Sequence, residues 1–315
     1  MNGPQTMTEP TAAASPPSGE PAPEGAAPAP AASTMPGEGG ARLIALMNQK
    51  GGVGKTTTTV NVGAALARAG RRVLLIDLDP QAHLTLSVGI DPESLEKSLY
   101  HLLTQPAVTA SQIVLEAGPN LGVLPAEVNL AGVEAELADR VATGAAQTVL
   151  RNKTRDLVQQ FEFVLIDCPP SLGLLTINAL TLAREVIVPM QAHFLALQGL
   201  SKLLETVSMV RQGINPDLAV SGVVLCMHEA QTILAAEVTN DLKSFFEQAR
   251  STDVPWRDAV VYEPPIRRNI KLAESPSFGK PIFDYAPESH GAADYAALAR
   301  AIAAQHAPHA DKPAS

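Results

Sequence analysis

The stretch Gln49-Lys50-Gly51-Gly52-Val53-Gly54-Lys55-Thr56 decides the fold of this chain. An apolar run, 43–47, precedes it, and a segment whose apolar residues recur with helical spacing, 55–69, follows it. A glycine-rich loop between a strand and a helix is the usual setting of a phosphate-binding loop. Its glycines let backbone N–H groups approach an anion, and the helix adds the positive end of its dipole. The stretch therefore predicts a P-loop within an α/β fold.

The lysines and hydroxyls of this loop carry its expected chemistry. Lys55 is expected to bind the β- and γ-phosphates, and the hydroxyl of Thr56 is expected to ligate Mg²⁺. An ordinary P-loop has glycine at the position of Gln49, and this chain carries an additional lysine, Lys50, directly after it. A plain glycine-rich turn would explain the glycines but not the accompanying lysine and hydroxyl. The sequence thus predicts ATP and Mg²⁺ as cofactors. The expected nucleotide contacts are Lys50, Gly51, Gly52, Val53, Gly54, Lys55, Thr56 and Thr57.

Three aspartates follow two other apolar runs. Asp77 and Asp79 come after the run 73–76, and Asp167 ends the run 163–166. In an open α/β sheet, the carboxyl ends of the strands face the ligand crevice. Asp77 and Asp167 are therefore expected near the Mg²⁺, directly or through water. An acid that ends a strand is otherwise often a helix cap or a turn residue, and the P-loop favours the metal interpretation here.

Apolar runs and helical segments alternate along the rest of the chain. Further strands are expected at 121–124, 186–189 and 220–226. Further helices are expected at 133–141, 145–160, 174–183, 196–211, 235–248 and 295–303. Strands rich in Val, Leu and Ile that alternate with helices are typical of a parallel sheet buried on both faces. We expect an α/β fold with a doubly wound, mainly parallel sheet and helices on both faces, as in P-loop NTPases.

The composition excludes several classes of protein. The chain has 315 residues, 46% of them hydrophobic, which is ample for a packed core. Its formal net charge of −9 excludes a protein that is basic overall, although a local basic patch stays compatible with it. Cys168 and Cys226 lack the spacing of a zinc site or a disulfide framework, so a reducing, cytoplasmic setting is expected. We expect neither a secretory signal nor a bilayer-spanning segment.

The two ends of the chain differ from its centre. Residues 1–41 are rich in Pro, Ala, Gly and Ser and contain no Lys or Arg. Such a segment buries too little apolar surface to offset its ordering entropy, so a disordered tail is expected. A solubilising role and a partner-docking role both stay open for it. The expected organisation is a tail at 1–41, an ATPase domain at 42–306 and a flexible C-terminal tail at 307–315.

Five blocks of sequence, taken in order, resemble one family. They are KGGVGKTTT at 50–58, DLDPQ at 77–81, DCPPS at 167–171, TINAL at 176–180 and AESPSFGKPI at 273–282. Together they resemble the ParA/Soj chromosome and plasmid partitioning ATPases, within the deviant Walker A group of P-loop ATPases. The last block is the most discriminating, since MinD and the nitrogenase iron protein lack it.

The resemblance implies a mechanism and roles for several residues. In that family, two ATP-bound monomers form a sandwich dimer that binds DNA without sequence preference, and a ParB-type centromere-binding partner stimulates hydrolysis and release. By position, Lys50 matches a lysine that reaches the nucleotide of the other subunit, and Asp79 matches the residue that positions the attacking water. Gly51 matches a glycine that must be small for the dimer to close. The implied catalytic residues are Lys50, Lys55 and Asp79, and the implied setting is the cytoplasm, at the nucleoid.

The family layout also suggests surfaces for DNA and for the base. Arg267, Arg268 and Lys271 match a stretch that contributes to the DNA-binding surface; the alternative is a solvated surface with ordinary salt bridges. Base contact is expected from the loop around Pro265. The chain departs from the family at 227–232, where the usual Met-x-Asp-x-Arg-Thr becomes MHEAQT, so any switch or partner contact there is left open.

Two other functions stay open. A MinD-like membrane-associated ATPase needs a C-terminal amphipathic helix with a basic polar face. The expected helix at 295–303 contains Arg300 as its one basic residue, so no stable membrane association is expected. A ParA-like ATPase that positions a protein cargo would use the same chemistry. His193 and His228 lie near strand ends without an evident metal partner, and the sequence assigns them no role.

Overall fold

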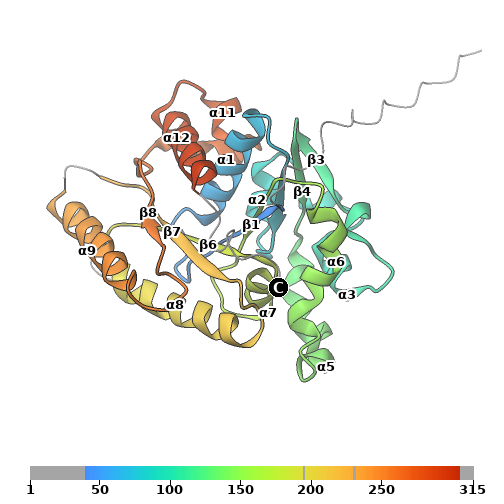
Figure 1. Cartoon of the computed structure of the whole chain (residues 1–315). Coiled ribbons are helices and arrows are strands. Elements are labelled where there is room, and N and C mark those ends of the chain that lie inside the picture. The colour runs from blue at the N-terminus through green and yellow to red at the C-terminus, as the bar shows by residue number, and fades with distance from the viewer. Residues whose placement is uncertain (1–39, 194–195, 230–231, 306–315) are drawn as a thin grey trace, which may run out of the picture. The chain divides into compact units, whose positions relative to one another are not determined.

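The computed structural model describes residues 40–193, 196–229 and 232–305 (Figure 1). The predicted tails at 1–41 and 307–315 lie outside the described residues, except for Gly40 and Ala41. All the described residues belong to one compact unit.

Eight strands in the described part of the chain form a single sheet. Their bounds are β1 Arg42–Leu46, β2 Val73–Asp77, β3 Leu115–Gly118, β4 Leu121–Leu124, β5 Phe163–Asp167, β6 Glu185–Met190, β7 Ala219–Leu225 and β8 Val260–Val261. The order across the sheet is β3-β4-β2-β5-β1-β6-β7-β8, and every neighbouring pair is parallel except β3–β4. The prediction of a doubly wound, mainly parallel sheet is confirmed.

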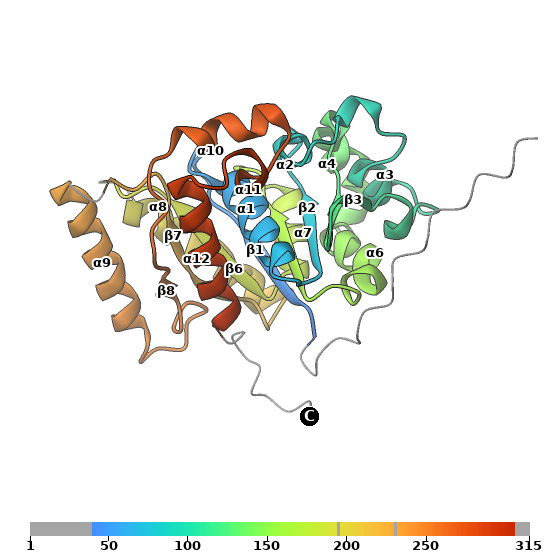
Figure 2. The same ribbon diagram turned by 90° about the horizontal axis from the view of Figure 1, so that it is seen from above.

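Helices cover both faces of this sheet (Figure 2). Their bounds are α1 Lys55–Arg68, α2 His83–Ser87, α3 Leu99–Thr104, α4 Val133–Glu136, α5 Ala138–Val141, α6 Val149–Val158, α7 Leu174–Leu182, α8 Ala196–Gly213, α9 Ile233–Ala249, α10 Ile270–Glu274, α11 Ile282–Tyr285 and α12 His290–Ala304. Successive side chains of β1 point to opposite faces. Ile44 and Leu46 pack in the core beneath α1 and α12, whereas Ala45 packs in the core beneath α7 and α8. Because both faces are covered, the central strands are apolar at nearly every position.

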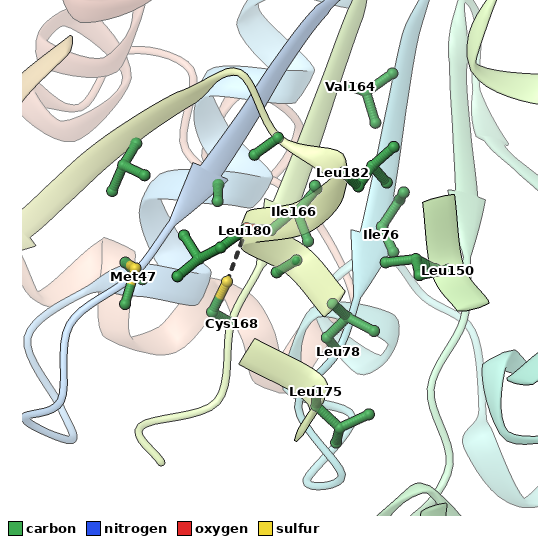
Figure 3. Close-up of a cluster of buried hydrophobic side chains, with 14 of the residues drawn as sticks. Met47, Ile76, Leu78, Leu150, Val164, Ile166, Cys168, Leu175, Leu180 and Leu182 are labelled. Atoms are coloured by element: carbon green, nitrogen blue, oxygen red, sulfur yellow. Dashed lines mark hydrogen bonds between the residues drawn. The ribbon is translucent and has the colours of Figure 1, made fainter. Parts of the chain in front are cut away.

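The core on the α7 side contains one of the two cysteines (Figure 3). Ile76 of β2 and Ile166 of β5 lie in it with Leu180 of α7. Cys168 follows β5, is fully buried, and donates a weak hydrogen bond from its Sγ to the carbonyl oxygen of Ile166 at 3.9 Å. Burial raises the pKa of the Cys168 thiol well above its usual range. Cys168 is therefore a packing residue of this core, not a reactive thiol.

The structure differs from the sequence prediction at short or weakly patterned elements. The sequence does not predict β3, which is half-exposed, or β8, which has two residues. The helix predicted at 133–141 is divided into α4 and α5 at Leu137. The helix predicted at 295–303 begins earlier, at His290, because the side chain of Ser289 accepts a hydrogen bond from the backbone N of Ala292.

Candidate nucleotide site

The loop between β1 and α1 has the backbone geometry of an anion-binding loop. Gly52 and Gly54 have φ values of 70° and 95°, a left-handed conformation that residues with a Cβ rarely adopt. A Cβ on Gly54 would also lie 3.3 Å from the Cβ and Sγ atoms of Cys226. α1 begins directly after the loop at Lys55, so its first turn adds unpaired N–H groups. The loop thus offers backbone amides to a phosphate group.

A hydroxyl from α1 and a carboxylate from β5 meet beside this loop. Thr56 Oγ1 donates a hydrogen bond to Asp167 Oδ2 at 2.6 Å, and Thr59 Oγ1 donates one to Asp167 Oδ1 at 3.3 Å. Asp77 lies opposite Asp167 in the parallel pair β2–β5, at the last position of both strands. Two strand ends and one helix start therefore bring together the three predicted metal residues, Thr56, Asp77 and Asp167.

The carboxylate of Asp77 accepts hydrogen bonds from residues that follow β2 in the chain. Its Oδ2 accepts hydrogen bonds from the backbone N of Thr85 at 2.9 Å and from Thr85 Oγ1 at 2.7 Å. Its Oδ1 accepts one from the backbone N of Asp79 at 3.2 Å. Asp77 Oδ2 already accepts two hydrogen bonds, whereas each oxygen of Asp167 accepts one, so Asp77 would act through its charge or through a water molecule. Thr56 and Asp167 are the better placed pair for direct ligation of Mg²⁺.

The two carboxylates place negative charge where a cation would stabilise it. Asp77 and Asp167 are both fully buried. Burial raises the pKa of Asp77 to about 6. Burial, together with the neighbouring charge of Asp77, raises the pKa of Asp167 to about 8. Hard oxygen ligands suit Mg²⁺, whose charge would favour the ionised form of both groups.

The donor set also suits a metal that is shared with a nucleotide. Within residues 40–193, 196–229 and 232–305, no group of three or more His, Cys, Asp or Glu side chains could hold a metal ion. Mg²⁺ commonly takes one or two protein ligands and completes its shell with phosphate oxygens and water. Thr56 and Asp167 fit that arrangement.

The two lysines of the loop have different partners. Lys55 is only 7% exposed, and its Nζ donates to the carbonyl oxygen of Lys50 at 3.3 Å. Lys50 itself is exposed, and its Nζ lies 2.7 Å from Nε2 of His193, in the loop after β6. Asp79 is half-buried after β2, and its Oδ1 accepts a hydrogen bond from the backbone N of Gln81 at 3.0 Å. Lys55 therefore serves the loop of its own chain, whereas the ammonium group of Lys50 lies at the surface.

Known proteins identify the family to which this site belongs. Residues 41–220 match a family model described as an AAA domain. The sporulation initiation inhibitor protein Soj of Bacillus subtilis is 45% identical over 263 residues, which cover 84% of this chain and 98% of that protein. The chain belongs to the ParA/Soj family of ATPases. The chromosome-partitioning ATPase Soj of Thermus thermophilus is 42% identical over 84% of this chain and 96% of its own length.

A solved structure supports the cofactors of this ParA/Soj-family ATPase. Cobyrinic acid a,c-diamide synthase from Mycobacterium smegmatis, with a bound ATP analog and magnesium, superposes with a TM-score of 0.69 at 39% identity. The match covers 84% of this chain and 94% of that one. The chain is thus an ATP-hydrolysing enzyme that uses ATP and Mg²⁺, as predicted. Lys55 and the backbone amides would bind phosphate, while Thr56 and Asp167 would hold the metal that neutralises the developing charge.

A cavity of about 500 Å³ adjoins the phosphate loop of the ParA/Soj-family ATPase. Its lining includes Gly54 and Thr57 of the phosphate loop and first helix, together with Met227, Ile266 and Tyr295. The volume lies within the range of small-molecule sites, and the lining is largely apolar. The base and ribose of the nucleotide would fit here, next to Thr57. Pro265, the residue predicted to contact the base, does not line the cavity, whereas its neighbour Ile266 does.

The three predicted DNA-binding residues lie close together, and each has an acidic partner. Arg267 forms an ion pair with Asp294 at 2.6 Å, and Lys271 forms one with Glu274 at 2.9 Å. Arg268 pairs at 3.1 Å with Glu229, which belongs to the segment where the chain departs from the family. Residues 230–231 of that segment lie outside the described residues. The basic surface is therefore largely neutralised within this chain.

Sequence reasoning missed two side chains at the site, Thr85 and His193. Thr85 is fully buried and donates a hydrogen bond to Asp77, and its signal was a hydroxyl residue in a short helix after the DLDPQ block. His193 lies three residues after β6 and contacts Lys50. Its position after a strand end was the one available signal, because its partner lies 143 residues away in the sequence.

Proposed function

We propose that this ATPase segregates DNA. An ATP-bound homodimer binds DNA without sequence preference, and a ParB-type centromere-binding partner stimulates hydrolysis and releases the dimer. The enzyme would act in the cytoplasm, at the nucleoid. Relatives named chromosome partitioning protein ParA in Myxococcus xanthus and Caulobacter vibrioides support this proposal. We further propose that residues 42–306 form the ATPase domain, with tails at 1–41 and 307–315.

One observation carries the proposal: the ammonium group of Lys50 lies outside the phosphate loop of its own chain. Lys55 already supplies the loop with a nearly buried cation, so a second cation is not required within the subunit. Lys50 is exposed on the face that carries the nucleotide, where a second subunit can approach. A lysine so placed would complete the phosphate site of a partner subunit, which would make hydrolysis depend on dimerisation.

The remaining residues have roles consistent with this cycle. Asp79 is half-buried two residues after β2, close to Asp77, and its Oδ2 could orient a water molecule towards the γ-phosphate. Arg268 and Lys271 would contact DNA phosphates from both subunits of the dimer. Doubling a basic patch strengthens non-specific DNA binding and makes it depend steeply on salt concentration.

The C-terminal helix bears on the membrane-associated alternative. Among the described helices, none combines the length and apolar character that crossing a bilayer requires. α12 packs against α1, and Tyr295, Leu298 and Ile302 are buried in the core there. Its apolar side is thus already covered by protein, whereas a membrane-binding amphipathic helix must expose that side.

DNA retention in the presence of different nucleotides tests the proposal. The wild-type protein should bind a non-specific duplex with a non-hydrolysable ATP analogue and release it with ADP. Lys50→Ala should still bind nucleotide but should lose both dimerisation and ATP-dependent DNA retention. Equal retention with ADP and with the analogue would contradict the DNA-segregation proposal. Binding to anionic liposomes instead of DNA, in ATP, would support the membrane-associated alternative, and binding to neither would favour a protein cargo.

A further inference from the structure

The end of β6 and the loop that follows it contact the first half of the phosphate loop at three points. Asn48 Nδ2 donates a hydrogen bond to the carbonyl oxygen of Pro189 at 2.9 Å. Gln191 Nε2 donates to the carbonyl oxygen of Gly52 at 3.4 Å. The third contact, Lys50 Nζ to His193 Nε2 at 2.7 Å, is the shortest of the three. It is also the one contact of this set that involves the charged group of Lys50.

The chemistry of the third contact fixes its direction. An ammonium group has three N–H donors and no acceptor, so His193 Nε2 must be the acceptor and must be unprotonated. The remaining ring proton is then on Nδ1. Among the described residues, His193 is the one side chain that accepts a hydrogen bond from Lys50 Nζ. The exposed cation of the loop is therefore held by a neutral imidazole of its own subunit.

A neutral acceptor at the surface holds a cation weakly. A carboxylate at the same place would add a full charge to the contact, and a guanidinium would repel Lys50. The contact with His193 is strong enough to favour one position of a flexible side chain. It is too weak to compete with a triphosphate, which offers several charged oxygens.

We propose that His193 is a positioning residue for Lys50. It holds the ammonium group within its own subunit until the nucleotide of a second subunit displaces it. The hold opposes dimerisation and so raises the protein concentration at which the ATP dimer forms. This effect on the dimer rests on the proposed cross-subunit role of Lys50, whereas the hold itself rests only on the geometry within one chain.

Acylation of Lys50 in the nucleotide-free monomer tests directly whether His193 restrains the Lys50 ammonium group. Amine-reactive acylation, measured by mass spectrometry, should be about three- to tenfold faster at Lys50 in His193→Ala than in wild type. His193→Gln keeps a neutral oxygen acceptor and should restore the wild-type rate. His290→Ala removes an exposed histidine from the first turn of α12 and should leave the rate unchanged. Exposed Lys97 provides an internal reference within each digest.

A second measurement separates this inference from the proposed function. With a non-hydrolysable ATP analogue, His193→Ala should dimerise at a protein concentration lower by a similar factor, and His193→Gln should match wild type. An unchanged rate of Lys50 acylation in His193→Ala would overturn the positioning role. Faster acylation with unchanged dimerisation would support the hold within the subunit and overturn the cross-subunit role of Lys50.

Discussion

Two glycines of the phosphate loop are constrained by different surroundings. Gly54 has φ of 95°, and a Cβ there would meet the side chain of Cys226 at 3.3 Å, so its own chain requires glycine. A Cβ on Gly51 would meet no heavy atom of the described residues within 4 Å, other than those of its chain neighbours. The family implies a small residue at Gly51, and we propose that this requirement comes from outside the chain.

Gly51→Val should therefore separate folding from dimerisation. We expect its free energy of unfolding to stay within about 0.5 kcal/mol of wild type and its binding of ATP·Mg²⁺ to persist. Light scattering with a non-hydrolysable analogue should show a monomer. As a matched control, Gly54→Val should lose nucleotide binding. A stable ATP dimer of Gly51→Val would show that the second subunit does not approach this residue.

The buried pair Asp77 and Asp167 predicts how stability depends on pH. Both pKa values are raised in the folded protein, from 3.8 to about 6 and about 8, so the folded state binds more protons than the unfolded state over this range. Stability from these groups is fully present below about pH 3.8 and is lost as pH rises, up to about 6 for Asp77 and up to about 8 for Asp167. Without Mg²⁺, Asp167→Asn should gain stability over wild type as pH rises from 6 to 8, by up to about 1.4 kcal/mol per pH unit.

Urea unfolding at several pH values measures this difference. Saturating ATP·Mg²⁺ should reverse it, because the metal stabilises the ionised wild-type site and Asp167→Asn lacks a charged ligand. A difference that does not change with pH would mean that Asp167 is already ionised in the metal-free protein.

At the scale of elements, one arginine joins the two ends of the described chain. Arg42, at the start of β1, donates to both carboxylate oxygens of Glu185 in β6, at 2.8 and 2.6 Å. Its Nη1 also donates to the carbonyl oxygens of Ile302 and Gln305 at the end of α12. Glu185 is 1% exposed and accepts a further hydrogen bond from Ser221 in β7 at 2.6 Å. These contacts link β1, β6 and β7 to the last helix, at the end of β1 opposite the phosphate loop.

Arg42→Ala should destabilise the fold without altering the nucleotide loop. It would leave the Glu185 carboxylate buried and without its cation, at a cost of about 3–5 kcal/mol in the free energy of unfolding. Arg68→Ala is a suitable control, because its ion pair with Asp284 is exposed, at 58% and 53%, and should contribute about 0–1 kcal/mol. Equal losses in urea unfolding for the two variants would show that the buried pair is no stronger than a surface pair.

The sequence predicts helices and strands correctly where the pattern of apolar residues matches the burial of the element. β2 and β5 are continuous apolar runs that end in an acid, and the sequence predicts both together with the metal residues Asp77 and Asp167. β3 was not predictable because its residues are half-exposed, and the start of α12 required recognition of the Ser289 cap. The contacts of Thr85 with Asp77 and of His193 with Lys50 depend on how the strand ends assemble, which local pattern does not encode.

For the whole molecule, a net charge of −9 must be reconciled with DNA binding. The three candidate residues differ in how firmly they are held. Arg267 pairs with Asp294, which is 5% exposed and also accepts a hydrogen bond from the backbone N of Arg267. The side chain of Arg267 therefore stabilises the fold. Arg268 and Lys271 form exposed pairs that contribute little to stability and can exchange an acid for a DNA phosphate.

Glu274→Gln should therefore strengthen DNA binding instead of weakening it. Glu274 accepts hydrogen bonds from Lys271 Nζ at 2.9 Å and from the hydroxyl of Tyr285 at 2.7 Å, and the neutral amide releases the lysine from its ion pair. Each freed cation that contacts a phosphate steepens the slope of log K against log salt by about 0.9, so the dimer should gain up to about 2. Fluorescence anisotropy between about 50 and 200 mM salt measures this slope with a non-hydrolysable ATP analogue.

Glu116→Gln provides the control. Glu116 is an exposed acid in β3, at the far edge of the sheet, so the substitution removes the same charge and should leave the slope unchanged. Equal effects of the two substitutions would mean that DNA responds to net charge alone, and no effect of either would place the DNA surface away from α10.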